Sequence, residues 1–453
     1  MVRVSRSEII RKLKADKIYK GPLQGETKTL KEARQLYFAL TYIDPTKAQH
    51  TKPYYLSEET KKYSSSSNVF KLFDYQEDIK SKLLKSIANS KSSYRAMLTL
   101  PTGGGKTATA ASTVLELLSE GGSSNCLWIA PGLELLEQAI SAFKKIDAIN
   151  QFNGEILIKR SYVSKSISPT GKLPIVFSTP QMLNSHYKSK ILHKFDIIVF
   201  DEAHMAYAPT YQNAILNSMG PRAILIGLSA TPGRTNLKEL RPLSELFDHN
   251  IISSDILSNK PVQTLREMGV LSYLQVSKIQ GHEAHSFPYL KSNRIAQTSA
   301  ATIMINKKRF HAIVRKIQSK QTEKTIVFAY SVKYANAISA YLSACGIDNG
   351  LVTNTTAEHV RADILNRFST GKLNIVVNKS ILATGYDVPA IKNVIISHPV
   401  KSSILYEQIL GRGSRGPKVG GDEFSSIFEL DENFEYHGDP ISYMRFKNRY
   451  LVN

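Results

Sequence analysis

Short apolar runs alternate with amphipathic stretches along the first half of the chain. Residues 75–88 have the 3.6-residue periodicity of a helix, and the apolar run AMLTL follows at 96–100. The later runs CLWIAP, LPIVFSTP, FDIIVFDEAH and AILIGLSATP are continuously apolar, and helical patterns such as ELLEQAISAFKK separate them. Continuous apolar runs that alternate with helices are typical of a parallel sheet with crossover helices.

The same pattern returns in the second half. Helical patterns at 308–318 and 334–344 alternate with the runs TIVFAY, NIVVN and VIISHP. We therefore predict an α/β fold with two doubly wound parallel-sheet domains in tandem, at 66–245 and 301–453, joined by a linker and lead-in segment at 246–300. A length of 453 residues is too great for one core, which agrees with two domains.

Residues 1–65 form a basic segment of mixed composition. Helices are predicted at 7–17 and 30–42, and the polar run KKYSSSSN at 61–68 indicates a loop or linker. This small helical extension could be a simple appendage, an accessory grip on nucleic acid or a docking segment for a protein partner.

Charge is the most unusual feature of the composition. Lys and Arg number 59 against 38 Asp and Glu, which gives a formal net charge of +21. A field of this sign attracts polyanions and is typical of proteins that bind nucleic acid. Two distant cysteines argue against a disulfide framework or a zinc site, and no apolar run reaches membrane-spanning length. We therefore expect a cytoplasmic protein with no membrane partner.

The segment PTGGGKT (101–107) follows a predicted strand and precedes a helix. In this context glycine N–H groups can surround the phosphates of a nucleotide at the helix N-terminus. Lys106 would contact the β- and γ-phosphates, and the Thr107 hydroxyl would bind Mg²⁺. Leu100 stands where the general pattern has glycine, so a glycine-rich turn without a ligand is an alternative. The predicted nucleotide-binding residues are Thr102, Gly103, Gly104, Gly105, Lys106 and Thr107.

Two adjacent carboxylates, Asp201 and Glu202, end another predicted strand. Asp201 would provide a second contact to Mg²⁺, and Glu202 would orient or deprotonate an attacking water. A solvated acidic turn would also fit these two residues alone. Because Lys106 and Asp201 both stand at carboxyl ends of strands, where ligands bind in open α/β sheets, together they predict hydrolysis of a nucleoside triphosphate.

The stretch YEQILGRGSRG at 406–416 places Arg412 and Arg415 three residues apart among glycines. On one helical turn the two side chains would share a face. The stretch could be a frayed helix end with two solvated cations. Alternatively, the glycines clear space for two guanidinium groups to reach an anion.

Over residues 70–435 these segments resemble, in order, the motifs of superfamily 2 helicases and translocases of the DExH type. Tyr75 and Gln76 resemble the Q motif, PTGGGKT motif I, APGLELLEQ motif Ia and STPQ motif Ib. DEAH resembles motif II, SAT motif III, IVFAYS motif IV, ATGYDVP motif V and QILGRGSR motif VI. The resemblance implies two RecA-like domains with ATP and Mg²⁺ between them.

The resemblance also implies residue roles. Gln408 would hold the phosphate or water, and Arg412 and Arg415 would act as arginine fingers on the γ-phosphoryl group. Gln76 would read the adenine, and Asp387 would approach the ribose. The residues implied to hold the nucleic-acid backbone are Pro131, Thr179, Thr384 and Gly385, and those implied to couple the two sites are His204, Ser229 and Thr231.

Two positions depart from the family pattern. Phe73 stands where related Q motifs have arginine, which weakens the basis for adenine selectivity. Gly132 replaces a basic residue of motif Ia and so removes an expected phosphate contact. Motif V, the segment after motif VI and the lead-in TLREMGVLSYLQV at 264–276 are most similar to one branch, which holds RadD-type repair helicases, the UvsW-type phage helicase and restriction-type motor subunits.

This branch implies an ATP-driven motor that moves on, unwinds or remodels single-stranded, forked or branched DNA, in repair, recombination or phage defence. An RNA helicase shares the same core motifs and is a second interpretation. A third is a nucleic-acid-sensing ATPase switch inside a multi-subunit defence or restriction complex.

Overall fold

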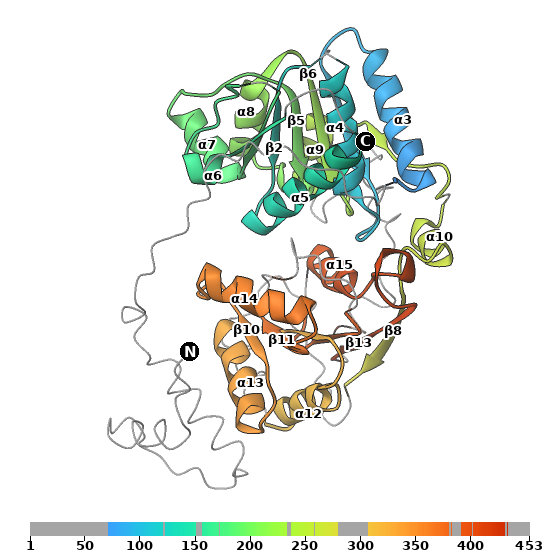
Figure 1. Ribbon diagram of the computed structural model, residues 1–453, viewed down its shortest axis with the longest axis vertical. Coiled ribbons are helices and arrows are strands. Elements are labelled where there is room, and N and C mark those ends of the chain that lie inside the picture. The colour runs from blue at the N-terminus through green and yellow to red at the C-terminus, as the bar shows by residue number, and fades with distance from the viewer. Residues whose placement is uncertain are drawn as a thin grey trace. The chain divides into compact units, whose positions relative to one another are not determined.

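A computed structural model (Figure 1) describes residues 71–120, 123–150, 156–171, 173–232, 237–257, 259–279, 307–379, 391–400 and 402–430, together with positions 382 and 433. These residues divide into two compact bodies between Leu271 and Ser272, and each body is considered by itself. The predicted extension at 1–65 lies outside the described residues. No helix among the described residues is both long and apolar enough to cross a membrane.

The first body contains a parallel sheet with the strand order β3-β4-β2-β5-β6-β1-β7. Its strands are β1 (Tyr94–Thr99), β2 (Cys126–Ile129), β3 (Leu157–Arg160), β4 (Pro174–Ser178), β5 (Phe195–Asp201), β6 (Met219–Ser229) and β7 (Ile251–Ile252). Its helices are α3 (Asp74–Ala88), α4 (Lys106–Ser119), α5 (Leu133–Asn150), α6 (Ser161–Ser164), α7 (Pro180–Lys188), η2 (Ala203–Met205), α8 (Pro209–Ser218), α9 (Leu237–Leu246) and α10 (Pro261–Glu267).

Helices cover both faces of this sheet, which explains why its inner strands β2 and β4 are buried on every residue. All four residues of β2 are buried. Leu127 and Ile129 point to the face covered by α7, α8 and α9, whereas Trp128 packs edge-on against Phe143 of α5 on the other face, with 5.2 Å between ring centroids. Alternate residues of one strand therefore serve two separate halves of the core, the pattern of a doubly wound sheet.

The second body repeats this architecture with the strand order β10-β11-β9-β12-β13-β8, again all parallel. Its strands are β8 (Tyr273–Lys278), β9 (Thr325–Phe328), β10 (Gly350–Val352), β11 (Ile375–Asn378), β12 (Asn393–Ile396) and β13 (Phe424–Glu429). Its helices are α12 (Lys307–Gln318), α13 (Val332–Ala344), α14 (Glu358–Ser369), α15 (Ser403–Arg412) and η5 (Pro417–Val419).

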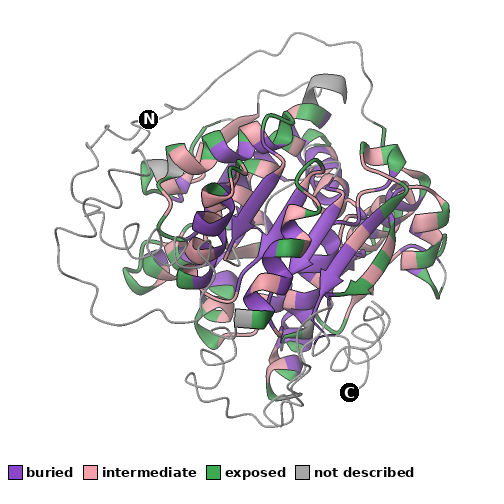
Figure 2. Ribbon diagram, turned by 90° about the horizontal axis from the view of Figure 1, so that it is seen from below, coloured by how far each residue is buried: buried purple, intermediate pink, exposed green. Residues whose placement is uncertain are grey.

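Helices cover both faces of the second sheet as well. Ile313 of α12 and Ile338 of α13 lie in one core cluster with Val327 of β9. On the opposite face, the end of α15 lies against Val394 and Ile427. Figure 2 shows the buried strands of the protein enclosed by helices whose outer surfaces are exposed. Two parallel α/β sheets in tandem confirm the predicted fold class.

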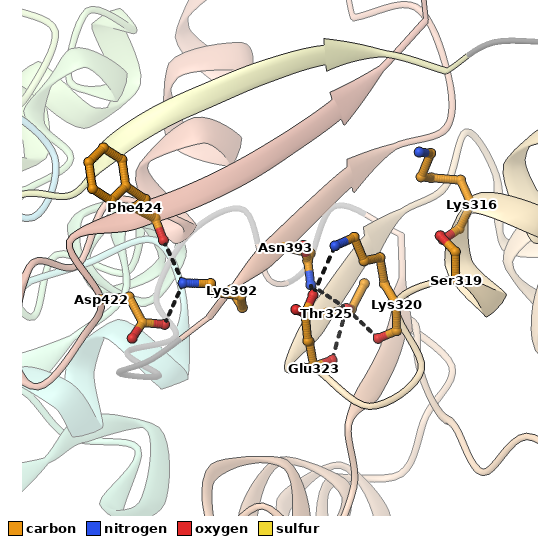
Figure 3. Close-up of polar contacts among 9 residues, drawn as sticks. All are labelled: Lys316, Ser319, Lys320, Glu323, Thr325, Lys392, Asn393, Asp422 and Phe424. Atoms are coloured by element: carbon orange, nitrogen blue, oxygen red, sulfur yellow. Dashed lines mark hydrogen bonds and ion pairs between the residues drawn. The ribbon is translucent and has the colours of Figure 1, made fainter.

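Polar side chains fix the amino ends of the central strands of the second sheet (Figure 3). The Asn393 side-chain amide, at the start of β12, donates to Glu323 Oε2 at 2.7 Å and to Thr325 Oγ1, at the start of β9, at 3.2 Å. Lys392 Nζ donates to the carbonyl oxygen of Phe424, the first residue of β13, at 3.0 Å. Because these strands are parallel, their carboxyl ends lie together at the opposite edge of the sheet.

Candidate nucleotide site

The glycine-rich segment forms a tight loop between β1 and α4. The amide of Gly104 donates to the carbonyl oxygen of Pro101 at 2.9 Å. Gly103 and Gly105 have φ angles of 85° and 84°, which favour glycine. Gly105 is the N-cap of α4, so the N-terminal amides of a 14-residue helix begin at Lys106. Helix N-terminal amides beside a lysine suit a phosphate group.

Two residues of α3 hold this loop through side-chain hydrogen bonds. The Tyr75 hydroxyl and the Gln76 side-chain amide both donate to the carbonyl oxygen of Gly104, at 2.9 and 3.0 Å. Gln76 Oε1 in turn accepts from the amide of Phe73 at 2.9 Å. A Cβ atom at Gly105 would lie 2.1 Å from Gln76 Nε2, so this position requires glycine. The Tyr75 contact was not predicted from the sequence.

Leu100, the departure from the general loop pattern, has a structural explanation. Its side chain is fully buried, and its Cβ lies 3.3 Å from the place where a Cβ on Gly104 would stand. The leucine is therefore a core residue beneath the loop, and the loop takes its left-handed turns at Gly103 and Gly105 instead.

The carboxylates of motif II stand at the same edge of the sheet. β6 separates β1 from β5, with Thr99 in register with Ser229 and Leu228 in register with Asp201. Asp201 is 2% exposed, and its Oδ1 accepts from the amide of Glu202 at 2.9 Å. Burial, followed by the charge of Glu202, raises the pKa of Asp201, while Lys106 and the Thr107 hydroxyl act to lower it.

These donors fit a magnesium ion. Asp201 Oδ2 is buried and has no hydrogen-bond partner among the described residues. The influence of Lys106 and Thr107 on the pKa of Asp201 shows that both lie close to that carboxylate. Mg²⁺ prefers carboxylate and hydroxyl oxygens and keeps several waters, so Asp201 and Thr107 are the side chains that would hold it.

Glu202 and the coupling residues lie around this carboxylate. Glu202 has a φ of 52°, a left-handed conformation that is strained for a residue with a side chain. Its Oε2 lies 3.1 Å from Nδ1 of the buried His204. At the end of β6, between motifs I and II, the amide of Thr231 donates to Ser229 Oγ at 3.1 Å. Residues from four predicted motifs thus meet at one sheet edge.

Pro131 and Thr179 follow neighbouring strands at this edge. Pro131 follows β2 and is partly exposed. Thr179 follows β4, and its hydroxyl accepts from the amide of Met182 at 3.2 Å to cap α7, which begins with Pro180. The hydroxyl of Thr179 therefore has a local structural role, and its role toward nucleic acid stays a prediction.

In the second body, Gln408 and Arg412 lie on α15, and Arg415 lies in the loop that follows. A Cβ at Gly413 would stand 3.1 Å from Val394 Cγ2, so the glycine lets the end of α15 pack on the sheet. This role of Gly413 differs from the predicted one, which was to clear space around the arginines. Thr384, Gly385 and Asp387 lie outside the described residues.

The backbone of the arginine loop is fixed by polar contacts. The Ser272 hydroxyl oxygen lies 2.5 Å from the carbonyl oxygens of both Arg415 and Asp422. Lys392 also contacts the Asp422 carboxylate at 3.5 Å (Figure 3). Two residues before Gln408, the buried Tyr406 hydroxyl donates to the Glu429 carboxylate at 2.9–3.0 Å, which ties α15 to β13.

Comparisons with known proteins agree with this arrangement. The family described as "Type III restriction enzyme, res subunit" matches residues 69–234, and the "Helicase conserved C-terminal domain" matches residues 308–416. The chain is similar to the putative ATP-dependent helicase IRC3 of Saccharomyces cerevisiae, with 24% identity over 76% of this chain and 49% of the relative. It is also similar to the type I restriction enzyme EcoKI endonuclease subunit of Escherichia coli, with 24% identity over 78% of this chain and 34% of the relative.

Among solved structures, S. cerevisiae Dbp5 bound to RNA and ADP BeF3 has a TM-score of 0.57 and 15% identity, covering 83% of this chain and 93% of that one, a likeness of fold alone. The chain spans about half the length, or less, of the two curated relatives. With two helicase-family matches and the motifs of both bodies in family order, this chain belongs to the superfamily 2 helicases and translocases and is related to their restriction-type motors.

Proposed function

We propose that this chain is an ATP-dependent motor that moves on, unwinds or remodels DNA. The observation that carries the proposal is the meeting of Lys106, Thr107, Asp201 and Glu202 at one sheet edge, beside a glycine loop that opens onto a helix N-terminus. A lysine, a hydroxyl and two carboxylates at such a loop form the set of groups that phosphoryl transfer to water requires.

In this proposal Lys106 and the amides of Gly103, Gly104 and Gly105 bind the β- and γ-phosphates, with Thr102 at the loop entrance. Glu202 accepts a proton from the attacking water, and its Oε2 lies 3.1 Å from His204 Nδ1. Mg²⁺, when held by Thr107 and Asp201, supplies charge stabilisation to the phosphates. Gln76 and Asp387 would contact the adenine and ribose.

The arginines of the second body complete the proposed reaction. Arg412 and Arg415 neutralise charge on the transferring γ-phosphoryl group, and Gln408 orients the phosphate or the water. Gln408 is mostly buried on α15, and the Ser272 contact fixes the backbone at Arg415. A fixed backbone is what an arginine finger needs, because a guanidinium held in place loses little energy to reorganisation.

Nucleic acid is the proposed track of the motor. Pro131 and Thr179, with Thr384 and Gly385, would contact its backbone, and His204, Ser229 and Thr231 would connect that groove to the nucleotide. The net charge of +21 supports a polyanion partner. DNA is proposed as the substrate because of the likeness to restriction-type proteins. A protein partner could dock on residues 1–65.

The test is the steady-state ATPase rate of the full chain without nucleic acid and with single-stranded DNA, duplex DNA, forked DNA or RNA. Strong stimulation by DNA and little by RNA supports the proposal. Stimulation by RNA alone would make it an RNA helicase, and ATP hydrolysis without unwinding or movement would favour a sensing switch.

Arg415→Ala tests the assigned chemistry within the same assay. We expect kcat to fall by a factor on the order of 10³ while ATP binding is retained, because an arginine finger acts in the transition state. Arg315→Ala, an exposed arginine on α12, is the matched control and should keep full activity. Equal losses in binding and turnover would instead make Arg415 a ground-state contact.

A further inference from the structure

A charged cluster lies in the first body away from the nucleotide loop. Arg160, the last residue of β3, donates from Nε to Glu137 Oε1 at 2.7 Å and from Nη2 to Oε2 at 3.2 Å. The Tyr162 hydroxyl, on α6, donates to the same Oε1. Glu137 comes from α5, so three elements meet at one carboxylate. Nothing in the proposed ATPase reaction uses this cluster.

The strand order places the cluster beside the proposed nucleic-acid contacts. β3 is the outermost strand and pairs with β4, where Arg160 is in register with Phe177, two residues before Thr179. The next strand, β2, ends at Ile129, two residues before Pro131. Three neighbouring strands therefore present their carboxyl ends on this part of the edge, the side of an open α/β sheet where ligands bind.

The side chains of Arg160 and Glu137 differ in their exposure to solvent. The Arg160 side chain is 11% exposed, whereas the Glu137 side chain is 49% exposed. The carboxylate therefore lies outermost and covers the guanidinium group. A simple surface ion pair would leave both groups solvated, but here a nearly buried arginine requires an anion in front of it.

The groups around Glu137 form a strong anion site. Burial acts to raise its pKa, but hydrogen bonds from Arg160 and Tyr162, with the charges of Arg160 and Lys144, bring the pKa below its ordinary value. The Glu137 carboxylate is thus ionised at neutral pH. It accepts two hydrogen bonds from the Arg160 guanidinium group and one from the Tyr162 hydroxyl. The same fork geometry fits two oxygens of a phosphate group.

We propose that Arg160 and Tyr162 form a binding site for one backbone phosphate of a nucleic-acid strand, and that Glu137 occupies this site until the phosphate displaces it. The inference rests on the proposed function, which makes nucleic acid the partner of this edge. Glu137 acts as an internal competitor, so it weakens binding and keeps the partly buried guanidinium group compensated when no strand is present. The competition requires no ATP.

The first body offers a matched control. Arg95 binds Asp248 in the same forked manner, with Nε at 2.9 Å from Oδ2 and Nη2 at 2.6 Å from Oδ1. Arg95 lies near the start of β1, at the opposite edge of the sheet. Asp248→Asn therefore removes one negative charge from the same kind of ion pair, but at the amino ends of the strands, where we propose no nucleic-acid contact.

The experiment measures the affinity of the full chain for a fluorescent oligo-dT, and for an oligo-U of equal length, over a range of salt concentrations without nucleotide. Glu137→Gln should tighten binding about fivefold or more, and should steepen the slope of log K against log salt by about 0.7, the value for one further phosphate contact on a single strand. Asp248→Asn should change affinity by less than about twofold, the small general effect of one distant charge.

Two further variants complete the test. Arg160→Lys keeps the charge but loses the fork, so it should weaken binding and should cancel most of the gain of Glu137→Gln in the double variant. Equal effects of Glu137→Gln and Asp248→Asn would overturn the inference. If the unaltered chain bound neither oligonucleotide, the proposed function would fail first, so the two failures are distinguishable. Melting temperatures identify any variant that loses its fold.

Discussion

The Asp201 carboxyl group is buried, and burial disfavours its ionised form. The ionised carboxylate therefore lowers the free energy of unfolding. Burial and Glu202 raise its pKa from 3.8 to about 7. Between these two values the folded state binds more protons than the unfolded state, so this residue lowers stability as pH rises, and the cost is complete above pH 7. Such a cost at a reaction centre is expected when the missing counter-charge arrives with the ligand.

Asp201→Asn should therefore stabilise the protein free of nucleotide and magnesium. We expect its melting temperature to rise by several degrees at pH 8 and by clearly less at pH 5, because the native carboxyl is already mostly protonated at pH 5. Thermal unfolding in EDTA measures this, while ATP hydrolysis should be lost. Asp196→Asn, on the same strand, is the control. A gain that is equal at both pH values would show that ionisation of Asp201 is not its cause.

The sequence restricts the candidate site residues where chemistry limits the choice of side chain, and their roles stay predictions. Lys106, Asp201 and Glu202 were selected because phosphate and magnesium need those groups at the ends of strands, and the structure brings Lys106 and Asp201 close together. The contact from Tyr75 to Gly104 was missed because it joins positions 29 residues apart through packing. The fork of Arg160 on Glu137 was missed for the same reason.

At the scale of elements, the attachment of α15 to its sheet depends on a buried polar pair. Tyr406 and Glu429 are both fully buried. Burial raises the pKa of Glu429 to about 7, and the hydrogen bond from Tyr406 and the charge of Lys278 act in the opposite direction. The tyrosine hydroxyl is therefore the donor that makes an ionised Glu429 tolerable beneath the helix that carries Gln408 and Arg412.

Tyr406→Phe should lower the melting temperature, and should lower it more at pH 8 than at pH 6. At pH 8 the Glu429 carboxylate, which has lost its hydrogen-bond donor, is ionised. The expected loss is about 1–3 kcal/mol, the cost of leaving a buried acceptor without its donor. Tyr406→Phe combined with Glu429→Gln should recover much of the loss at pH 8 and remove the pH dependence. No recovery in the double variant would mean that the tyrosine acts through packing alone.

Elements with strong local patterns were predicted well. The helix expected at 308–318 is α12 at Lys307–Gln318, and the one expected at 334–344 is α13 at Val332–Ala344. β8 was assigned to a lead-in segment, although it is the edge strand paired with β13. Its exposed and half-buried residues lack a continuous apolar run, and its partner lies some 150 residues away, so only the folded sheet identifies it.

At the scale of the whole molecule, the residues on both sides of the division between the two bodies are hydrogen-bonded: Leu271 within the first body and Ser272 within the second. In the first body Leu265 of α10 is buried, and its Cδ1 lies 3.6 Å from the place of a Cβ on Gly104. Gly269, at a φ of 71°, ends the helix, and the amides of Val270 and Leu271 both donate to the carbonyl oxygen of Leu265. Leu271 is therefore tied to Leu265, which packs beside the nucleotide loop.

The next residue is fixed to the second body. The amide of Ser272 donates to the carbonyl oxygen of Ser414 at 3.3 Å, and its hydroxyl oxygen lies 2.5 Å from the carbonyl oxygens of Arg415 and Asp422. Leu265–Ser272 thus connects a residue packed near Gly104 to the backbone of the proposed arginine finger. We predict that a shift of the nucleotide loop is transmitted to Arg415 through this short segment, because Leu265 is packed in the first body and Ser272 is hydrogen-bonded in the second.

Two glycines inserted between Leu271 and Ser272 test this connection, because the insertion leaves both sets of contacts in place and only slackens the chain between them. We expect kcat for ATP to fall about tenfold or more, since small misplacement of a catalytic group is costly, while the KM for ATP and the melting temperature stay unchanged. The same insertion after Gly371, an exposed turn with no neighbour within 4 Å of its Cβ position, controls for added length. Unchanged kcat in the Leu271–Ser272 variant would mean that the two bodies cooperate without this segment, and a lower melting temperature would mean that it only stabilises the fold.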